Sequence, residues 1–219
     1  MREMEKSLLK KKVISLYSQN FLEKIYTILR FALSPISDME AYVPQKGKIL
    51  DLGCGTGIFA NILCMGSKDR NVLGIDLSSS RIATARMISK DRPNLKFITG
   101  DVNSVAFGDY GIITIIDLLH HMPYPEQEKI LLKVYTKLQD NGLLIIKDLE
   151  KSPYWKYIFH YIQDSISYKG AKLYFRSSED MVGLLRSIGF AVETIPLSSG
   201  YPHPHVLYKC GKKSGHGPN

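Results

Sequence analysis

The sequence lacks the features that mark membrane-spanning, secreted or disulfide-bonded proteins. It contains no run of about 18 uninterrupted apolar residues, and its first residues include Arg2, Glu3 and Glu5 rather than an apolar signal core. The three cysteines, at positions 54, 64 and 210, are widely spaced and form no Cys-x-x-Cys pair. Because neither a disulfide framework nor a zinc site is indicated, we expect reduced cysteines, no metal and a cytoplasmic protein.

The chain also has little excess charge outside its two ends, although its net charge is +8. Residues 1–30 carry seven basic and three acidic side chains, and residues 209–219 carry three lysines and no acid. The stretch between them carries nineteen basic and eighteen acidic side chains. A nearly neutral body lacks the broad basic face that binding to a phosphate backbone requires, which disfavours nucleic acid as a partner.

Residues 1–45 predict a helical N-terminal extension. Apolar residues recur four positions apart from Leu9 to Leu29, which predicts one amphipathic helix over this range. This helix is basic, so it has two interpretations. It either packs on its own domain or rests on an anionic membrane as a peripheral contact.

Residues 46–211 predict an α/β domain. Nearly continuous apolar segments alternate with segments of helical period, as in a parallel sheet covered on both faces. The repeated order strand, helix, strand predicts a doubly wound sheet. The expected strands are 48–52, 71–76, 95–99, 111–118, 142–147, 191–195 and 205–210, and the expected helices are 58–65, 79–89, 126–138 and 178–188. Asn141 and Gly142 are expected to end the helix 126–138, and residues 212–219 are expected to be a disordered tail.

A glycine-rich turn, Asp51-Leu52-Gly53-Cys54-Gly55-Thr56-Gly57, lies between an expected strand and an expected helix. Glycines allow the chain to turn sharply and leave main-chain amides open to a ligand. The Gly-x-Gly-x-Gly spacing differs from the Gly-x-Gly-x-x-Gly of dinucleotide binders, and no Gly-Lys-Ser/Thr follows. The spacing therefore disfavours a nicotinamide-dependent dehydrogenase and a nucleotide triphosphatase.

Polar residues end three further strands where an adenosyl ligand would need them. Asp76 ends the second expected strand, where it can accept from both ribose hydroxyls. Asp101 follows the third, where it can accept from an adenine amino group, and Asp117 follows the fourth. Each aspartate also has a simpler interpretation as a loop anchor, a helix cap or a turn residue. Their occurrence in this order favours a ligand site.

This ordered set of motifs resembles the class I S-adenosylmethionine-dependent methyltransferases over residues 45–210. The resemblance implies a mostly parallel seven-stranded sheet with a reversed last hairpin. It implies S-adenosylmethionine as cofactor and S-adenosylhomocysteine as product. The cofactor-binding residues that it implies are Asp51, Gly53, Cys54, Gly55, Gly57, Asp76, Leu77, Asp101, Val102, Asp117 and Leu118.

The resemblance also implies that the N-terminal extension and a helical insert after the fifth strand, residues 151–176, cover the acceptor as a lid. Residues 154–168 are the most aromatic stretch of the chain. Aromatic side chains in a lid favour an apolar, aromatic or lipid-like acceptor. Packing of this stretch as ordinary core is the competing interpretation.

His120, His121 and His160 are the candidate catalytic residues, and Asp148 is a further candidate base. Methyl transfer is an in-line displacement that depends mainly on alignment in a dry pocket, so a base is optional. A phenol or alcohol acceptor would benefit from a histidine base, whereas packing around the ligand is the competing role for His120 and His121.

The predicted function is methyl transfer from S-adenosylmethionine to a small, apolar or aromatic metabolite or a lipid-like acceptor, without a metal. No Asn/Asp-Pro-Pro-Tyr/Phe motif and no Pro-Cys nucleophile follows the fourth strand, which disfavours methylation of nucleic-acid bases. An RNA or other nucleic-acid methyltransferase and a non-catalytic cofactor-binding scaffold are the alternatives.

Overall fold

A computed structural model describes residues 3–149, 173–197, 200–202 and 204–212. The helices are α1 (Glu3–Leu16), α2 (Phe21–Leu33), η1 (Met39–Tyr42), α3 (Ile58–Gly66), α4 (Ser79–Ile88), η2 (Leu119–His121), α5 (Tyr124–Lys137) and α7 (Ser178–Ile188). The strands are β1 (Gly47–Leu52), β2 (Arg70–Asp76), β3 (Leu95–Thr99), β4 (Tyr110–Ile116), β5 (Leu138–Leu149), β6 (Phe190–Pro196) and β7 (His205–Lys212). No helix of these described ranges combines the length and the apolar character needed to cross a bilayer.

The strands form one seven-stranded sheet in the order β3-β2-β1-β4-β5-β7-β6. β1 pairs with β2, β2 with β3, and β4 with β5 in parallel. β7 runs antiparallel to both β5 and β6. The predicted doubly wound sheet with a reversed last hairpin is therefore confirmed.

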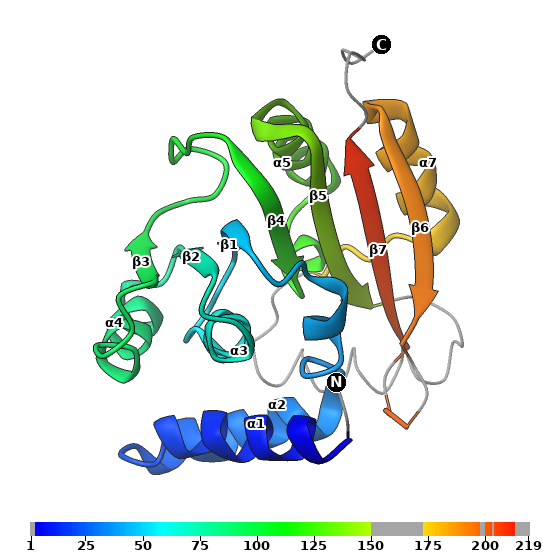
Figure 1. The fold of residues 1–219 in the computed structure, drawn as a ribbon. Coiled ribbons are helices and arrows are strands. Elements are labelled where there is room, and N and C mark those ends of the chain that lie inside the picture. The colour runs from blue at the N-terminus through cyan, green and yellow to red at the C-terminus, as the bar shows by residue number, and fades with distance from the viewer. Residues whose placement is uncertain (1–2, 150–172, 198–199, 203, 213–219) are drawn as a thin grey trace. The chain divides into compact units, whose positions relative to one another are not determined.

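The chain divides into two compact units, of which the first comprises residues 1–105. In this unit α3 and α4 pack against β2 and β3, and α1 packs against α3. Figure 1 shows α1 and α2 side by side below α3 and α4. The core consists of apolar side chains fully shielded from solvent, including Val13, Ile49, Leu50, Leu52, Ile62, Leu63 and Ile75.

The single amphipathic helix expected from Leu9 to Leu29 is wrong, because the chain forms two helices there. Asn20 is the N-cap of α2, and its side-chain oxygen accepts from the N–H groups of Leu22 and Glu23 at 3.0 and 3.2 Å. Such a cap satisfies amides that have no partner inside the helix and starts a new helix at that point.

The break also reverses the burial of the predicted apolar stripe. Its first half faces the core and its second half faces solvent: Leu9, Val13 and Tyr17 are buried, whereas Phe21, Ile25 and Leu29 are exposed. A stripe that is continuous in sequence is therefore divided between two surfaces.

The second unit comprises residues 106–219. β4, β5, β7 and β6 form its sheet, and α5 and α7 pack on each other and on β5, β6 and β7 (Figure 1). The expectation that Asn141 and Gly142 end a helix is wrong, because α5 already ends at Lys137 and both residues lie in β5. Asn141 has a φ of +58°, and the pairing of β4 with β5 shifts register beside it. The Asn-Gly pair therefore marks an irregularity of the strand.

Candidate functional site

The loop between β1 and α3 has a conformation that favours glycine. Gly53, Gly55 and Gly57 have φ angles of +73°, +55° and +81°, all in the left-handed region. The N–H groups of Gly53 and Cys54 both donate to the carbonyl of Ile75, at 2.8 and 3.0 Å. The end of β2 thus holds the glycine loop in place.

Asp76, the last residue of β2, binds the same loop. Its Oδ2 accepts from the N–H of Gly55 at 2.9 Å, and its Oδ1 accepts from the N–H of Ser78 at 2.9 Å. The simpler interpretation as a helix cap does not hold, because the N-cap of α4 is Ser78, whereas Asp76 accepts from the N–H of that residue. Each carboxylate oxygen still has a second acceptor position, so the buried Asp76 is also compatible with a ribose hydroxyl.

The loop has room for a ligand that lies against the main chain. A Cβ added at Gly55 would have no heavy atom within 4 Å, whereas one at Gly57 would lie 2.7 Å from Cζ of Phe97. Within the described residues, the hydroxyl oxygen of Thr56 is buried and has no hydrogen-bond partner. An open backbone beside an unsatisfied buried hydroxyl fits a cofactor that carries polar groups.

Tyr17, just after α1, is hydrogen-bonded to this loop. Its hydroxyl is buried and donates to the carbonyl of Thr56 at 2.9 Å. Burial raises the pKa of the phenol, so Tyr17 remains a protonated donor. Sequence reasoning missed this role because Tyr17 there was one member of an apolar stripe.

Cys54 lies in the loop but is not activated as a nucleophile. Burial raises the pKa of its thiol, and the carboxylates of Asp51 and Asp76 raise this pKa further. A protonated thiol is a poor nucleophile.

The buried Asp51 stands at the end of β1. Its predicted contact with the methionine moiety stays a prediction.

The remaining cofactor-binding candidates of the first unit differ in their surroundings. Val102 is buried, whereas Leu77 is 74% exposed. The carboxylate of Asp101 accepts from the N–H of Asn103 at 3.0 Å and from the hydroxyl of Ser104 at 2.9 Å. Asp101 therefore serves as a turn residue, which the sequence left open, and its contact with adenine stays a prediction.

In the second unit, Asp117 follows β4 with a φ of +51°, which is uncommon for a residue other than glycine. The N–H of Asp117 donates to the carbonyl of Lys147 at 2.9 Å, and its carboxylate accepts from the Lys147 ammonium at 2.5 Å. Both side chains are buried. A buried ammonium needs a partner of this kind, so the pair stabilises Asp117 in its unusual conformation. The predicted contacts of Asp117 and Leu118 with the cofactor stay predictions.

A second buried pair lies close to the first in the chain, because His120 is in η2, three residues after Asp117, and Asp148 follows Lys147 in β5. Nδ1 of His120 is hydrogen-bonded to Oδ1 of Asp148, and both side chains are buried. Because a carboxylate accepts hydrogen bonds, Nδ1 of His120 is the donor in this pair. A histidine oriented in this way by a carboxylate is able to take a proton at Nε2.

The residues around His120 fix its position. Its ring stacks on Phe175, with centroids 5.1 Å apart and planes 9° apart. Its carbonyl accepts from the N–H of Tyr174 at 2.8 Å. The side chain of Gln127 donates to the carbonyls of Leu119 and Tyr174 at 3.0 and 2.8 Å. The sequence alone did not indicate these contacts, because the partners are distant in the chain.

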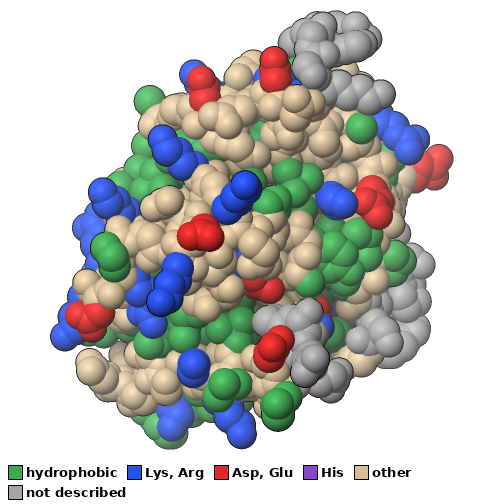
Figure 2. Space-filling model, viewed as in Figure 1, with side chains coloured by type: hydrophobic (Ala, Val, Ile, Leu, Met, Phe, Trp, Pro, Cys, Tyr) green, Lys and Arg blue, Asp and Glu red, His purple; other side chains and the backbone are tan. Residues whose placement is uncertain are grey.

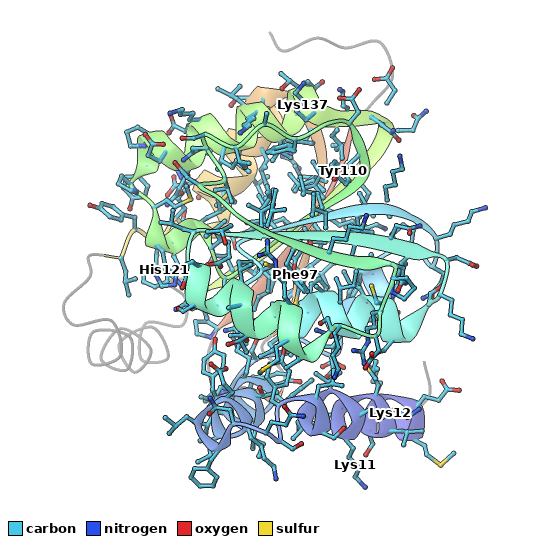
Figure 3. The ribbon with its side chains drawn as sticks, turned by 90° about the vertical axis from the view of Figure 1, so that its left-hand side faces the viewer. Lys11, Lys12, Phe97, Tyr110, His121 and Lys137 are labelled. Atoms are coloured by element: carbon cyan, nitrogen blue, oxygen red, sulfur yellow. The ribbon has the colours of Figure 1, made fainter. Side chains whose placement is uncertain are left out.

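Of the other two candidate histidines, the structure describes His121 but not His160. The ring of His121 lies 4.1 Å from that of His120, centroid to centroid, and is half-buried at the end of η2 (Figure 3). His160 and most of the predicted lid, residues 151–176, lie outside the described residues. Metal-binding groups of three or more His, Cys, Asp or Glu are absent from the ranges that the structure describes.

The chain is similar to known methyltransferases in sequence. Residues 49–142 match a family model described as a methyltransferase domain. The chain is 28% identical to the trans-aconitate 2-methyltransferase of Deinococcus radiodurans over 116 residues, 52% of this chain and 43% of that protein. It is 30% identical to the ubiquinone biosynthesis O-methyltransferase of Albidiferax ferrireducens over 116 residues, 50% of this chain and 44% of that protein. The chain thus spans less than half the length of these curated relatives.

Solved structures show the same fold. An O-methyltransferase family protein from Burkholderia thailandensis superposes with a TM-score of 0.68 at 16% identity, covering 83% of this chain and 56% of that one. The magnesium protoporphyrin IX methyltransferase of Synechocystis with bound SAH superposes with a TM-score of 0.67 at 19% identity, covering 89% of this chain and 88% of that one.

The sheet order and the glycine loop after β1 define a Rossmann-like α/β protein of the methyltransferase type. Together with the sequence matches, they show that residues 49–142 form a methyltransferase domain of the class I S-adenosylmethionine-dependent type.

Proposed function

We propose that this chain transfers a methyl group from S-adenosylmethionine to a hydroxyl group of a small, apolar or aromatic acceptor. The glycine loop after β1 and the predicted cofactor-binding aspartates would bind the cofactor, and His120 would act as general base. The observation that carries the proposal is the buried pair of His120 and Asp148, in which a carboxylate orients the imidazole ring.

The glycine loop supports the choice of cofactor. When bound, S-adenosylmethionine supplies a methyl group that its positively charged sulfur activates for displacement. Gly55 would present its open backbone to the methionine moiety, and the hydroxyl of Thr56 would gain the partner that it lacks among the described residues. Asp76 would accept from the ribose through its second lone pairs while it keeps Gly55 in place.

His120 would move one proton in the reaction. Its Nε2 would take the proton of the acceptor hydroxyl, and the imidazolium that results would be stabilised by Asp148. Asp148 is then a positioning residue, because it holds the tautomer and orientation of the ring without touching the acceptor. Burial makes this attraction stronger than it would be in water.

The nature of the acceptor is inferred from two sources. Phe175 lies against the ring of His120, which favours an apolar or aromatic group nearby. One curated relative is named for trans-aconitate, and the other is named as an O-methyltransferase of ubiquinone biosynthesis. A carboxylate acceptor would need no base, so the role of His120 distinguishes a hydroxyl acceptor from a carboxylate.

The test is turnover by His120→Asn with a panel of phenols, alcohols and carboxylic acids, measured as formation of S-adenosylhomocysteine. We expect the variant to lose on the order of 100-fold or more in kcat on its best hydroxyl acceptor, because the proton acceptor is gone.

His121→Asn is the matched control, since it changes the adjacent histidine and leaves the pair of His120 with Asp148 intact. It should keep kcat within a few-fold of the wild type. Equal losses in both variants would assign the two rings to packing instead. Binding of S-adenosylhomocysteine without turnover of any acceptor in the panel would favour the scaffold alternative.

A further inference from the structure

The exposed side of α2 is apolar. Six side chains on it are between 40% and 75% exposed: Phe21, Leu22, Ile25, Tyr26, Ile28 and Leu29. At roughly 100° per residue they cover an arc of about 160° that contains no charged residue. We call this set the apolar face of α2. A helix at a protein surface normally turns such a face toward the core, so its exposure requires an explanation.

The packing of α2 on its own unit uses the opposite side of the helix. Thr27 and Phe31 are buried there, and the ring of Phe31 lies 5.6 Å from the ammonium of Lys10 on α1. α1 in turn packs against α3 and places Val13 in the core. The apolar face is therefore not needed to hold α2 in place.

The exposed charged side chains of α1 and α2 are mostly basic. Lys24 of α2 and Lys11 and Lys12 of α1 are exposed, and so is Glu5 of α1, whereas Glu23 is half-buried. At roughly 100° per residue, Lys24 lies about 40° from the edge of the apolar face. Figure 3 shows Lys11 on the side of α1 that is turned away from α3 and α4. In Figure 2, Lys and Arg side chains stand next to apolar ones along the lower edge, where Figure 1 has α1. Residues 1–30 carry a net charge of +4, with seven basic and three acidic side chains.

We propose that α2 docks on an anionic lipid surface through its apolar face, with the exposed lysines of α1 and α2 contacting the headgroups. Large apolar side chains flanked by lysines are the features by which a helix lies in the interface plane of a membrane. α2 has 13 residues, which is too short to span a bilayer but sufficient for such a position.

The charge pattern favours lipid over a second copy of the chain. In a symmetric dimer the same patch meets itself, so the lysines around one apolar face would approach those of the other. Like charges brought together in this way oppose association. An anionic bilayer is complementary to both parts of the surface, the apolar face and the lysines. The proposal rests on α1 and α2 and is independent of the proposed function.

The test is co-sedimentation with vesicles of phosphatidylserine and phosphatidylcholine, compared with vesicles of phosphatidylcholine alone. We expect binding to the anionic vesicles that weakens with added salt, and much weaker binding to the neutral ones. Leu22→Glu with Leu29→Glu should reduce binding at least 10-fold, since two charges would enter the apolar interface. Lys11→Gln, Lys12→Gln and Lys24→Gln together should reduce it on the order of 100-fold.

Leu132→Glu is the matched control, because Leu132 is a similarly exposed leucine on α5 of the other unit. It should bind vesicles as the wild type does, and circular dichroism should show that every variant keeps its helices. Absence of vesicle binding by the wild type would overturn the proposal. The proposal would also be overturned if light scattering showed a wild-type dimer that does not bind vesicles, and if the Leu22→Glu, Leu29→Glu variant were a monomer.

Discussion

Gly55 and Gly57 occupy the same turn but are required for different reasons. Both have positive φ angles, so any L-residue at either position carries strain. At Gly57 a Cβ would in addition lie 2.7 Å from Cζ of Phe97, whereas at Gly55 it would meet no atom within 4 Å. The fold needs a small residue at Gly57. At Gly55 the space next to the backbone is open to a ligand.

Gly57→Ala and Gly55→Ala should therefore separate stability from binding. Gly55→Ala should cost about 1–2 kcal/mol of unfolding free energy through backbone strain, and Gly57→Ala should cost more because Phe97 must also move. Relative to its loss of stability, Gly55→Ala should lose more affinity for S-adenosylhomocysteine than Gly57→Ala does. Urea unfolding and calorimetry measure the two quantities. Equal affinity in Gly55→Ala and the wild type would show that the loop does not contact the cofactor.

The N-terminal helices show how one side chain sets the boundary of an element. α1 ends at Leu16, and Asn20 begins α2 by accepting from two amides. Glu23 stands three residues later, at the spacing of a capping box, but the N–H of Asn20 donates to the carbonyl of Tyr17 at 3.3 Å. This signal was present in the sequence. The helical period hides it, because Tyr17 and Phe21 remain four apart across the break.

Asn20→Ala should shorten or fray the start of α2 and lower the free energy of unfolding by about 1 kcal/mol. Vesicle binding should weaken as well, since Phe21 and Leu22 lie in the first turn of α2. Asn20→Asp is the control, because it keeps a side-chain oxygen that can accept from the same amides. Hydrogen exchange over residues 21–25 follows the fraying directly. Unchanged exchange in Asn20→Ala would mean that packing against α1, not the cap, defines the start of α2.

In the described part of residues 46–211, periodicity predicted the strands and the four longer helices, and the family resemblance predicted how the last strands reverse. The expected strand 95–99 and helix 178–188 agree with the structure residue for residue. Local patterns of this kind exist because each element must bury one face. β5 is longer than expected because Leu138–Asn141, which carries three polar residues, also forms part of it.

The contacts that make the candidate site could not be predicted in the same way. His120 and Asp148 are 28 residues apart, and Lys147 and Asp117 are 30 apart. Each pair forms only because β4 and β5 lie side by side in parallel, with Ile116 opposite Lys147. A single sequence gives each of these residues its type but not its neighbour. The aspartate–histidine orientation that supports a base role is therefore a product of the tertiary fold.

Binding of S-adenosylhomocysteine should stabilise the folded chain, and Asp76 should be needed for most of this effect. A ligand at 100 times its dissociation constant adds about 2.7 kcal/mol, which raises Tm by roughly 5–10 °C in a chain of this size. Asp76→Asn keeps one oxygen for the N–H of Ser78, but its amide group cannot accept both from Gly55 and from the ligand.

The relevant quantity is the ligand-induced shift in Tm, because Asp76→Asn also lowers the Tm of the unliganded protein by weakening the glycine loop. We expect this shift to fall by more than half in Asp76→Asn at the same ligand concentration. Asp91→Asn, an exposed aspartate of the same unit, should keep the full shift. If Asp76→Asn also keeps it, Asp76 serves only to hold Gly55 and start α4, and the ribose must be bound by other residues. If the wild type shows no shift, the loop does not bind this ligand.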